Sequence, residues 1–146
     1  MPIVTTIEGR IAQVAIDRPE KRNTLSSELC KDLAREFLEL NDDTRVRSIV
    51  LCGHNNVFCA GLDIEEQLAE NTPIFNEFQK VIDALDALSK PVVAAVSGPA
   101  VSQGAAMLYH CDLVFAGEHA LFSMPGLALG QTPRYGVSLL AVKSGG

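Results

Sequence analysis

The hydrophobic positions of this chain follow strand spacing in some stretches and helix spacing in others. Residues 3–7 and 11–16 are short apolar-rich runs on either side of Glu8-Gly9-Arg10, which predicts two strands joined in a hairpin. Residues 26–40 place apolar side chains on one helix face, with Ser26 as a candidate N-cap; these side chains are Leu29, Leu33, Phe37 and Leu40.

The rest of the chain alternates in the same way. The pattern predicts strands over 46–51, 92–96, 113–116 and 121–122, and helices over 63–68, 73–88 and 103–110, with a last helix from near Pro133. Residues 53–62 read as a loop and 97–100 as a turn. Because strands and helices alternate, the sequence predicts an α/β core with mostly parallel strand pairing.

Composition and net charge argue against several classes of function. The chain has 146 residues, 47% of them hydrophobic, with 12 Lys and Arg against 18 Asp and Glu, so the formal charge is −6. One domain is expected at this length. A net negative charge argues against binding nucleic acid or an anionic membrane. No stretch has the length of an apolar membrane span, and the N-terminus lacks the pattern of a secretory signal, so we expect a cytoplasmic protein.

The metal-ligating residue types show no ligand spacing. The four cysteines form no CxxC pair and are expected to be free thiols, mostly small buried hydrophobes. The three histidines have no metal spacing among themselves or with the cysteines. The sequence therefore predicts neither a metal nor a separate cofactor.

Two segments rich in small residues follow predicted strands, at 58–63 and 97–106. The first main-chain N–H groups of a helix have no partner within the helix, and small residues let a ligand approach them. Either segment alone fits a tight turn or close helix–sheet packing. Two of them after successive strands favour a site that holds an anion or a developing oxyanion.

These residues also match a family pattern. The chain resembles the crotonase superfamily, the enoyl-CoA hydratases and isomerases, along essentially its whole length. The matching motifs are residues 16–25, 46–53, 58–64, 90–100, 111–112, 120–125 and 129–133, in family order. The segments 98–101 and 129–133 are most similar to the Δ3,Δ2-enoyl-CoA isomerase branch, and to related CoA-binding domains that have lost catalysis.

The resemblance implies a single crotonase-like domain over 1–146, a spiral of ββα units, that binds an acyl-CoA thioester. The main-chain N–H groups of Leu62 and Gln103 would form an oxyanion hole for the thioester carbonyl and its enolate. CoA itself is expected only as part of the substrate. The other substrate-binding candidates are Ala60, Gly61, Asp63, Ile64 and Gly104, with Lys21 and Arg22 either contacting CoA phosphates or simply solvated.

The chain departs from the family where the family keeps its glutamates. The three matching positions hold Ala106, Gly126 and Arg134, none of which can act as a carboxylate base. Arg134 is either solvated or a partner for a carboxylate on a dicarboxylic acyl group, and Tyr135 is a candidate hydrogen-bond donor. Asp63 is expected to be a helix N-cap.

The family motifs, taken together with the missing glutamates, leave three possible functions. The first is an enoyl-CoA hydratase or isomerase, the second a noncatalytic acyl-CoA-binding or assembly module, and the third an acyl-CoA thioester hydrolase. Members of the family also continue into further helices that complete the acyl pocket and form trimers. The resemblance therefore suggests that a C-terminal helical part is missing here, and that the full-length protein is a homo-oligomer.

Overall fold

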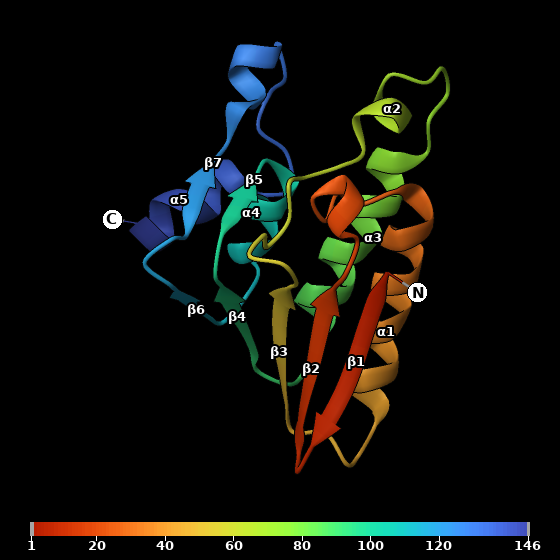
Figure 1. Cartoon of the computed structure of the whole chain (residues 1–146), viewed down its shortest axis with the longest axis vertical. Coiled ribbons are helices and arrows are strands. Elements are labelled where there is room, and N and C mark those ends of the chain that lie inside the picture. The colour runs from red at the N-terminus through yellow and green to blue at the C-terminus, as the bar shows by residue number, and fades with distance from the viewer. Residues whose placement is uncertain (1, 146) are drawn as a thin grey trace.

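A five-stranded sheet forms the centre of the molecule. In a computed structural model that describes residues 2–145, the strands are β1 (Ile3–Glu8), β2 (Ile11–Ile16), β3 (Ser48–Gly53), β4 (Val92–Val96) and β6 (Leu113–Ala116). They lie in the order β1-β2-β3-β4-β6, with β1 antiparallel to β2 and every other pair parallel. The mixed α/β architecture with a mostly parallel sheet is confirmed (Figure 1).

Two long helices cover one side of this sheet. They are α1 (Ser27–Asp42) and α3 (Ile74–Ala87), which pack against each other and carry buried apolar side chains. Ser26 caps α1 as expected, because its side chain accepts a hydrogen bond from the N–H of Leu29. The predicted apolar stripe of α1 lies in the core, with Leu29, Leu33, Phe37 and Leu40 all buried. Shorter elements precede α1 and α3, namely a 3₁₀ turn η1 (Pro19–Lys21) and α2 (Ile64–Gln67).

The C-terminal part folds over the end of the sheet, where it differs from the prediction. Residues 99 and 100, expected within a turn, belong to strand β5 (Pro99–Val101), which pairs in parallel with β7 (Leu121–Ser123). Helix α4 (Gln103–Leu108) follows β5 directly. The last helix, α5 (Val137–Gly145), begins later than expected and follows a 3₁₀ segment η2 (Pro125–Leu129). Tyr135 and Gly136 both have positive φ, which is incompatible with a helix starting at Pro133.

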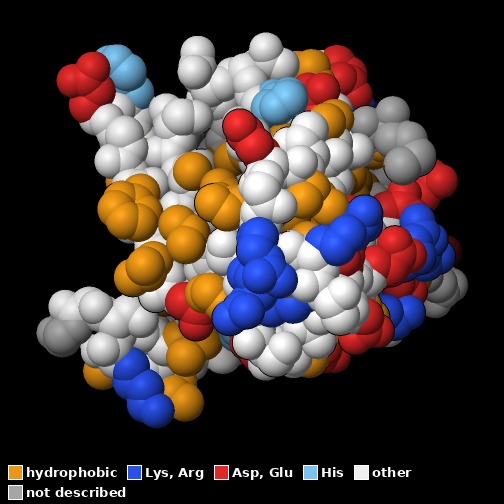
Figure 2. Space-filling model, turned by 90° about the horizontal axis from the view of Figure 1, so that it is seen from below, with side chains coloured by type: hydrophobic (Ala, Val, Ile, Leu, Met, Phe, Trp, Pro, Cys, Tyr) orange, Lys and Arg blue, Asp and Glu red, His pale blue; other side chains and the backbone are white. Residues whose placement is uncertain are grey.

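One edge of the molecule exposes apolar side chains. Leu113, Val114 and Phe115 of β6 are 57, 43 and 66% exposed, although a parallel strand is usually covered on both faces. Figure 2 shows hydrophobic side chains gathered on the side of β6 and the C-terminal end. The oligomer expected from the resemblance stays a prediction. None of the helices in residues 2–145 is long and apolar enough to cross a membrane.

Candidate functional site

The 58–63 segment is held against the turn that precedes α1. The N–H of Leu25 donates to Gly61 (2.8 Å), and the N–H of Asp63 donates back to Leu25 (2.8 Å), which makes a parallel bridge between Leu25 and Leu62. The N–H of Ala60 also donates to the carbonyl of Arg22 (3.2 Å). In such a bridge the main-chain N–H of Leu62 faces away from Leu25, toward the start of α4.

Leu62 and Gln103 meet there. The N–H of Leu62 donates to the side-chain Oε1 of Gln103 over 3.4 Å, and the hydroxyl of Ser102 donates to the same oxygen over 2.7 Å. Within residues 2–145, the main-chain N–H of Gln103 donates to no protein atom, as expected at the first position of a helix. The two candidate oxyanion-hole residues therefore lie in contact.

Ser102 adopts a conformation that usually belongs to glycine. Its φ and ψ are 55° and −117°, a strained combination for a residue with a side chain. The strain falls at the sharp turn from β5 into α4, where the N–H of Ser102 is anchored to the carbonyl of Ser123 (2.8 Å). The turn sets the direction of the Ser102 hydroxyl and of the first residue of α4. Sequence reasoning did not identify Ser102 as a site residue.

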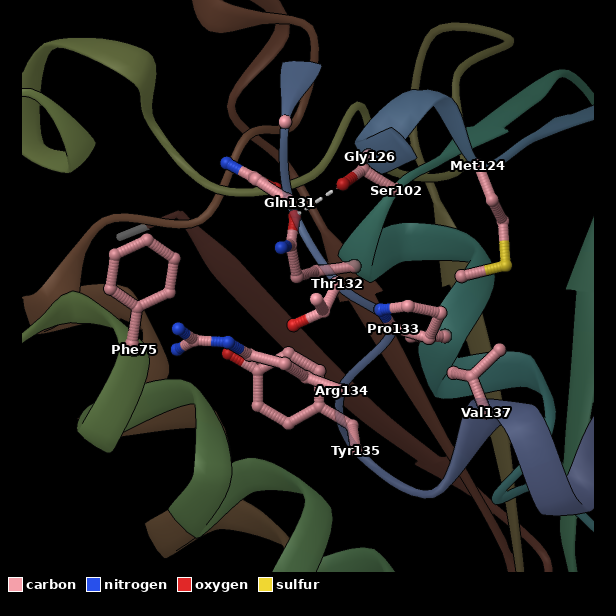
Figure 3. A pocket seen from close by; sticks show the side chains of 13 residues that line it. Phe75, Ser102, Met124, Gly126, Gln131, Thr132, Pro133, Arg134, Tyr135 and Val137 are labelled. Atoms are coloured by element: carbon pink, nitrogen blue, oxygen red, sulfur yellow. Dashed lines mark hydrogen bonds between the residues drawn. The ribbon is translucent and has the colours of Figure 1, made fainter. Parts of the chain in front are cut away.

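A cavity of about 320 Å³ opens beside this turn (Figure 3). The positions that the resemblance matched to catalytic glutamates all lie in its wall, and the wall contains no Asp or Glu. Its lining residues are Phe75, Ser102, Gln103, Ala106, Met124, Gly126, Gly130, Gln131, Thr132, Pro133, Arg134, Tyr135 and Val137. The structure thus brings together Gln103, Ala106, Gly126, Arg134 and Tyr135 at one site. It adds Phe75 and Met124, which no sequence motif identified.

Arg134 supplies the charge of the cavity. Its guanidinium lies 5.0 Å from the centre of the Phe75 ring, a cation–π contact, and Figure 3 shows the side chain extending toward that ring. No carboxylate among the described residues forms an ion pair with it. The cavity therefore combines polar groups with the Arg134 cation, which has no acidic partner in the described part of the chain.

Tyr135 places a phenol in the cavity wall beside Arg134. Its ring packs edge-on against Phe78, with centroids 4.7 Å apart, and its hydroxyl is buried without a hydrogen-bond partner among the described residues. Burial raises the pKa of Tyr135 above its usual value, against the opposing effect of the Arg134 guanidinium. At neutral pH the phenol therefore stays protonated, suited to donate a hydrogen bond and unsuited to act as a base.

Several other candidates lie outside this cavity. Asp63 is the N-cap of α2 as expected, accepting from the N–H of Glu65 (3.1 Å), and it also forms an ion pair with Arg18 (3.1 Å). Lys21 forms an ion pair with Glu65 (3.0 Å), while Ile64 is 66% exposed. Asp63 and Lys21 are thus each paired with an oppositely charged side chain. Contacts of Lys21, Arg22 and residues 60–64 with CoA stay predictions.

Two glycines allow the close approach that forms the site. A Cβ on Gly104 would lie 2.2 Å from the carbonyl oxygen of Cys59, so only glycine lets α4 pack against that backbone. Gly61 has a φ of +99°, and a Cβ there would lie 3.2 Å from Oε1 of Gln103. Gly104 lies in the packing interface between α4 and the 58–63 segment and does not line the cavity, and its contact with a substrate stays a prediction.

The thiol of Cys59 lies inside this scaffold. Cys59 is fully buried, and burial raises the pKa of its thiol to about 12. A thiol that stays protonated is a poor nucleophile. All four cysteines are free; Cys30 is also buried, and Cys52 and Cys111 are half-buried. The described residues include no cluster of His, Cys, Asp and Glu that could hold a metal ion.

Comparison with known proteins defines the class. A family model described as enoyl-CoA hydratase/isomerase matches residues 6–146. The chain is 35% identical over 139 residues to the short-chain-enoyl-CoA hydratase of Clostridium acetobutylicum, an alignment that covers 92% of this chain and 53% of that protein. It is 31% identical over 146 residues to the 2,3-dehydroadipyl-CoA hydratase of Escherichia coli, covering 99% and 57% of the two.

A solved structure of similar sequence has the same fold. The enoyl-CoA hydratase/isomerase of Pseudoalteromonas atlantica superposes with a TM-score of 0.89 at 33% identity, covering 97% of this chain and 56% of that one. The fold is crotonase-like. The chain belongs to the enoyl-CoA hydratase/isomerase family, within the crotonase superfamily, and it spans about half the length of the relatives it matches.

Proposed function

We propose that this chain binds an acyl-CoA thioester and polarises its carbonyl group between the main-chain N–H groups of Leu62 and Gln103. The observation that carries the proposal is the hydrogen bond from the Leu62 N–H to a carbonyl oxygen, that of the Gln103 carboxamide, at the wall of the cavity. The N–H of Gln103 itself is free of protein acceptors within residues 2–145. Two such donors stabilise the negative charge that develops on a thioester oxygen when an enolate forms.

The cavity wall determines which chemistry can follow. Hydration by two carboxylates needs acids where Ala106 and Gly126 stand, and Arg134 occupies the third family position. These residues cannot add water by that route. Binding and polarisation of the thioester is therefore the function these residues support best, ahead of turnover as a hydratase or isomerase.

Arg134 indicates which kind of acyl group the cavity would suit. Arg134, which forms no ion pair with a carboxylate within residues 2–145, is held over the Phe75 ring beside the phenol of Tyr135, and this arrangement suits an acyl chain that carries a second carboxylate. The relative from Escherichia coli is named for dehydroadipyl-CoA, which supports including such thioesters as candidates. Lys21 and Arg22, beside the 60–64 segment, are the proposed partners of the CoA phosphates.

Calorimetric titration with CoA, butyryl-CoA and succinyl-CoA tests this proposal. Both acyl thioesters are expected to bind at least tenfold more tightly than CoA, because only they offer a carbonyl oxygen to the two N–H groups. Succinyl-CoA is expected to bind more tightly than butyryl-CoA. Crotonyl-CoA, followed by the absorbance of its conjugated thioester and by release of free thiol, is expected to remain unchanged.

Each result has a defined reading. Equal affinity for CoA and both acyl thioesters would overturn the polarised carbonyl. Thiol release would replace the proposal with thioester hydrolysis, and loss of the conjugated absorbance without thiol release would replace it with hydration or isomerisation.

The donor of Gln103 is tested by comparing two variants. Gln103→Pro removes the main-chain N–H at a helix position that tolerates proline, whereas the control Gln103→Ala loses the side chain and keeps the N–H. The proline variant is expected to bind butyryl-CoA about tenfold more weakly than the alanine variant, with equal affinity for CoA. Equal butyryl-CoA affinity in the two titrations would show that this N–H does not contact the carbonyl.

A further inference from the structure

The side chain of Gln103 occupies the position that the proposed function assigns to a substrate. Its Oε1 is a carbonyl oxygen, it accepts from the Leu62 N–H (3.4 Å), and it accepts a second hydrogen bond from the Ser102 hydroxyl (2.7 Å). An amide carbonyl and a thioester carbonyl present the same acceptor to an N–H donor. Both would therefore compete for the Leu62 N–H.

The surroundings of Gln103 show that this contact closes the site. Gln103 is only 8% exposed and lines the cavity, whereas Leu62 is 2% exposed and does not. The carboxamide therefore stands between the cavity and the Leu62 N–H. Gly61 also lies close to this oxygen, because a Cβ built on Gly61 would lie 3.2 Å from Oε1 of Gln103.

We propose that the Gln103 carboxamide is an internal competitor of the thioester carbonyl, which binds the Leu62 N–H in the free protein and must turn away before an acyl-CoA can use it. This inference rests on the proposed function. It makes Gln103 bifunctional, because its main chain supplies one donor of the oxyanion hole while its side chain blocks the other. Ser102 holds the blocking position through its hydroxyl.

The proposal has a measurable consequence for affinity. A ligand that binds only the open state shows an apparent Kd equal to its intrinsic Kd divided by the open fraction. Removing the competitor raises that fraction to one, so the affinity for an acyl thioester rises. The affinity for CoA stays unchanged, because CoA has no carbonyl to place at Leu62. A residue that merely supported the fold would lower both affinities on removal.

Calorimetric titration of butyryl-CoA and of CoA into the 146-residue chain and three variants tests this inference. Gln103→Ala is expected to bind butyryl-CoA about tenfold more tightly than the unmodified chain, with unchanged affinity for CoA. Gln103→Glu keeps the shape and places a carboxylate at the same two donors, which strengthens the block. It is expected to bind butyryl-CoA about tenfold more weakly than the unmodified chain.

The control is Gln79→Ala, which removes an exposed carboxamide on α3 that donates to Asp83 (2.8 Å), and it is expected to change neither affinity. Unchanged or weaker butyryl-CoA binding by Gln103→Ala, in a chain that prefers butyryl-CoA to CoA, would overturn the internal competitor alone. If the unmodified chain does not prefer butyryl-CoA to CoA, the proposed function fails, and this inference fails with it.

Discussion

Replacing Asn23 by leucine is expected to lower the free energy of unfolding by roughly 3–5 kcal/mol, because each buried polar group left unpaired costs about 1–3 kcal/mol. Asn23 is fully buried and forms three side-chain hydrogen bonds. Its Oδ1 accepts from the N–H of Arg18 (2.8 Å), and its Nδ2 donates to the carbonyls of His54 (3.0 Å) and Val57 (2.7 Å). The residue thus ties the turn before α1 to the loop that leads into the candidate site.

Urea denaturation measures this loss. The matched control is Asn71→Leu, because Asn71 shares a left-handed φ (57° against 56°) but is exposed and its side chain makes no hydrogen bond within the described residues. The control reports the cost of leucine in that backbone conformation, about 1 kcal/mol. If Asn23→Leu and Asn71→Leu lose the same stability, the three hydrogen bonds do not hold the loop. Asn23→Asp, which keeps the acceptor and loses both donors, is expected to fall between the two.

The sequence predicted the parts of the fold that depend on local spacing. The stripe from Leu29 to Leu40 gave the buried face of α1, and the continuous apolar run of 92–96 gave a central strand. It did not predict β5, because Pro99–Val101 is a strand only through its pairing with β7, twenty-two residues further along the chain (99 to 121). Long-range pairing of this kind leaves no periodicity in three residues.

The candidate site shows the same difference between local motifs and long-range contacts. Leu62, Gln103, Ala106, Gly126 and Arg134 were identified from motif positions, and the structure places the last four in one cavity wall. The contact between the Gln103 carboxamide and the Leu62 N–H joins residues 41 positions apart and depends on a side-chain rotamer, which no motif encodes. The glycine-like conformation of Ser102 was also not foreseen, because serine normally avoids it.

Gly104→Ala is expected to damage both the fold and the site, through one steric contact. The added Cβ would lie 2.2 Å from the carbonyl oxygen and 2.9 Å from the carbonyl carbon of Cys59, both main-chain atoms that cannot turn aside. Overpacking of this kind costs about 1–3 kcal/mol, partly offset by the higher helix propensity of alanine, which is worth about 1 kcal/mol. Helix α4 must therefore shift away from the 58–63 segment.

That shift separates the two proposed donors, because Gln103 begins α4 and Leu62 belongs to the segment that α4 leaves. Gly104→Ala is therefore expected to lose the preference for butyryl-CoA over CoA, as well as to melt at a lower temperature. The control is Gly145→Ala, where a Cβ would meet nothing within 4 Å, and it is expected to change neither property. Only a site built from both segments loses its selectivity when the segments separate. A Gly104→Ala variant that melts at a lower temperature but keeps its full preference for butyryl-CoA would therefore show that thioester binding does not depend on the spacing between α4 and Leu62.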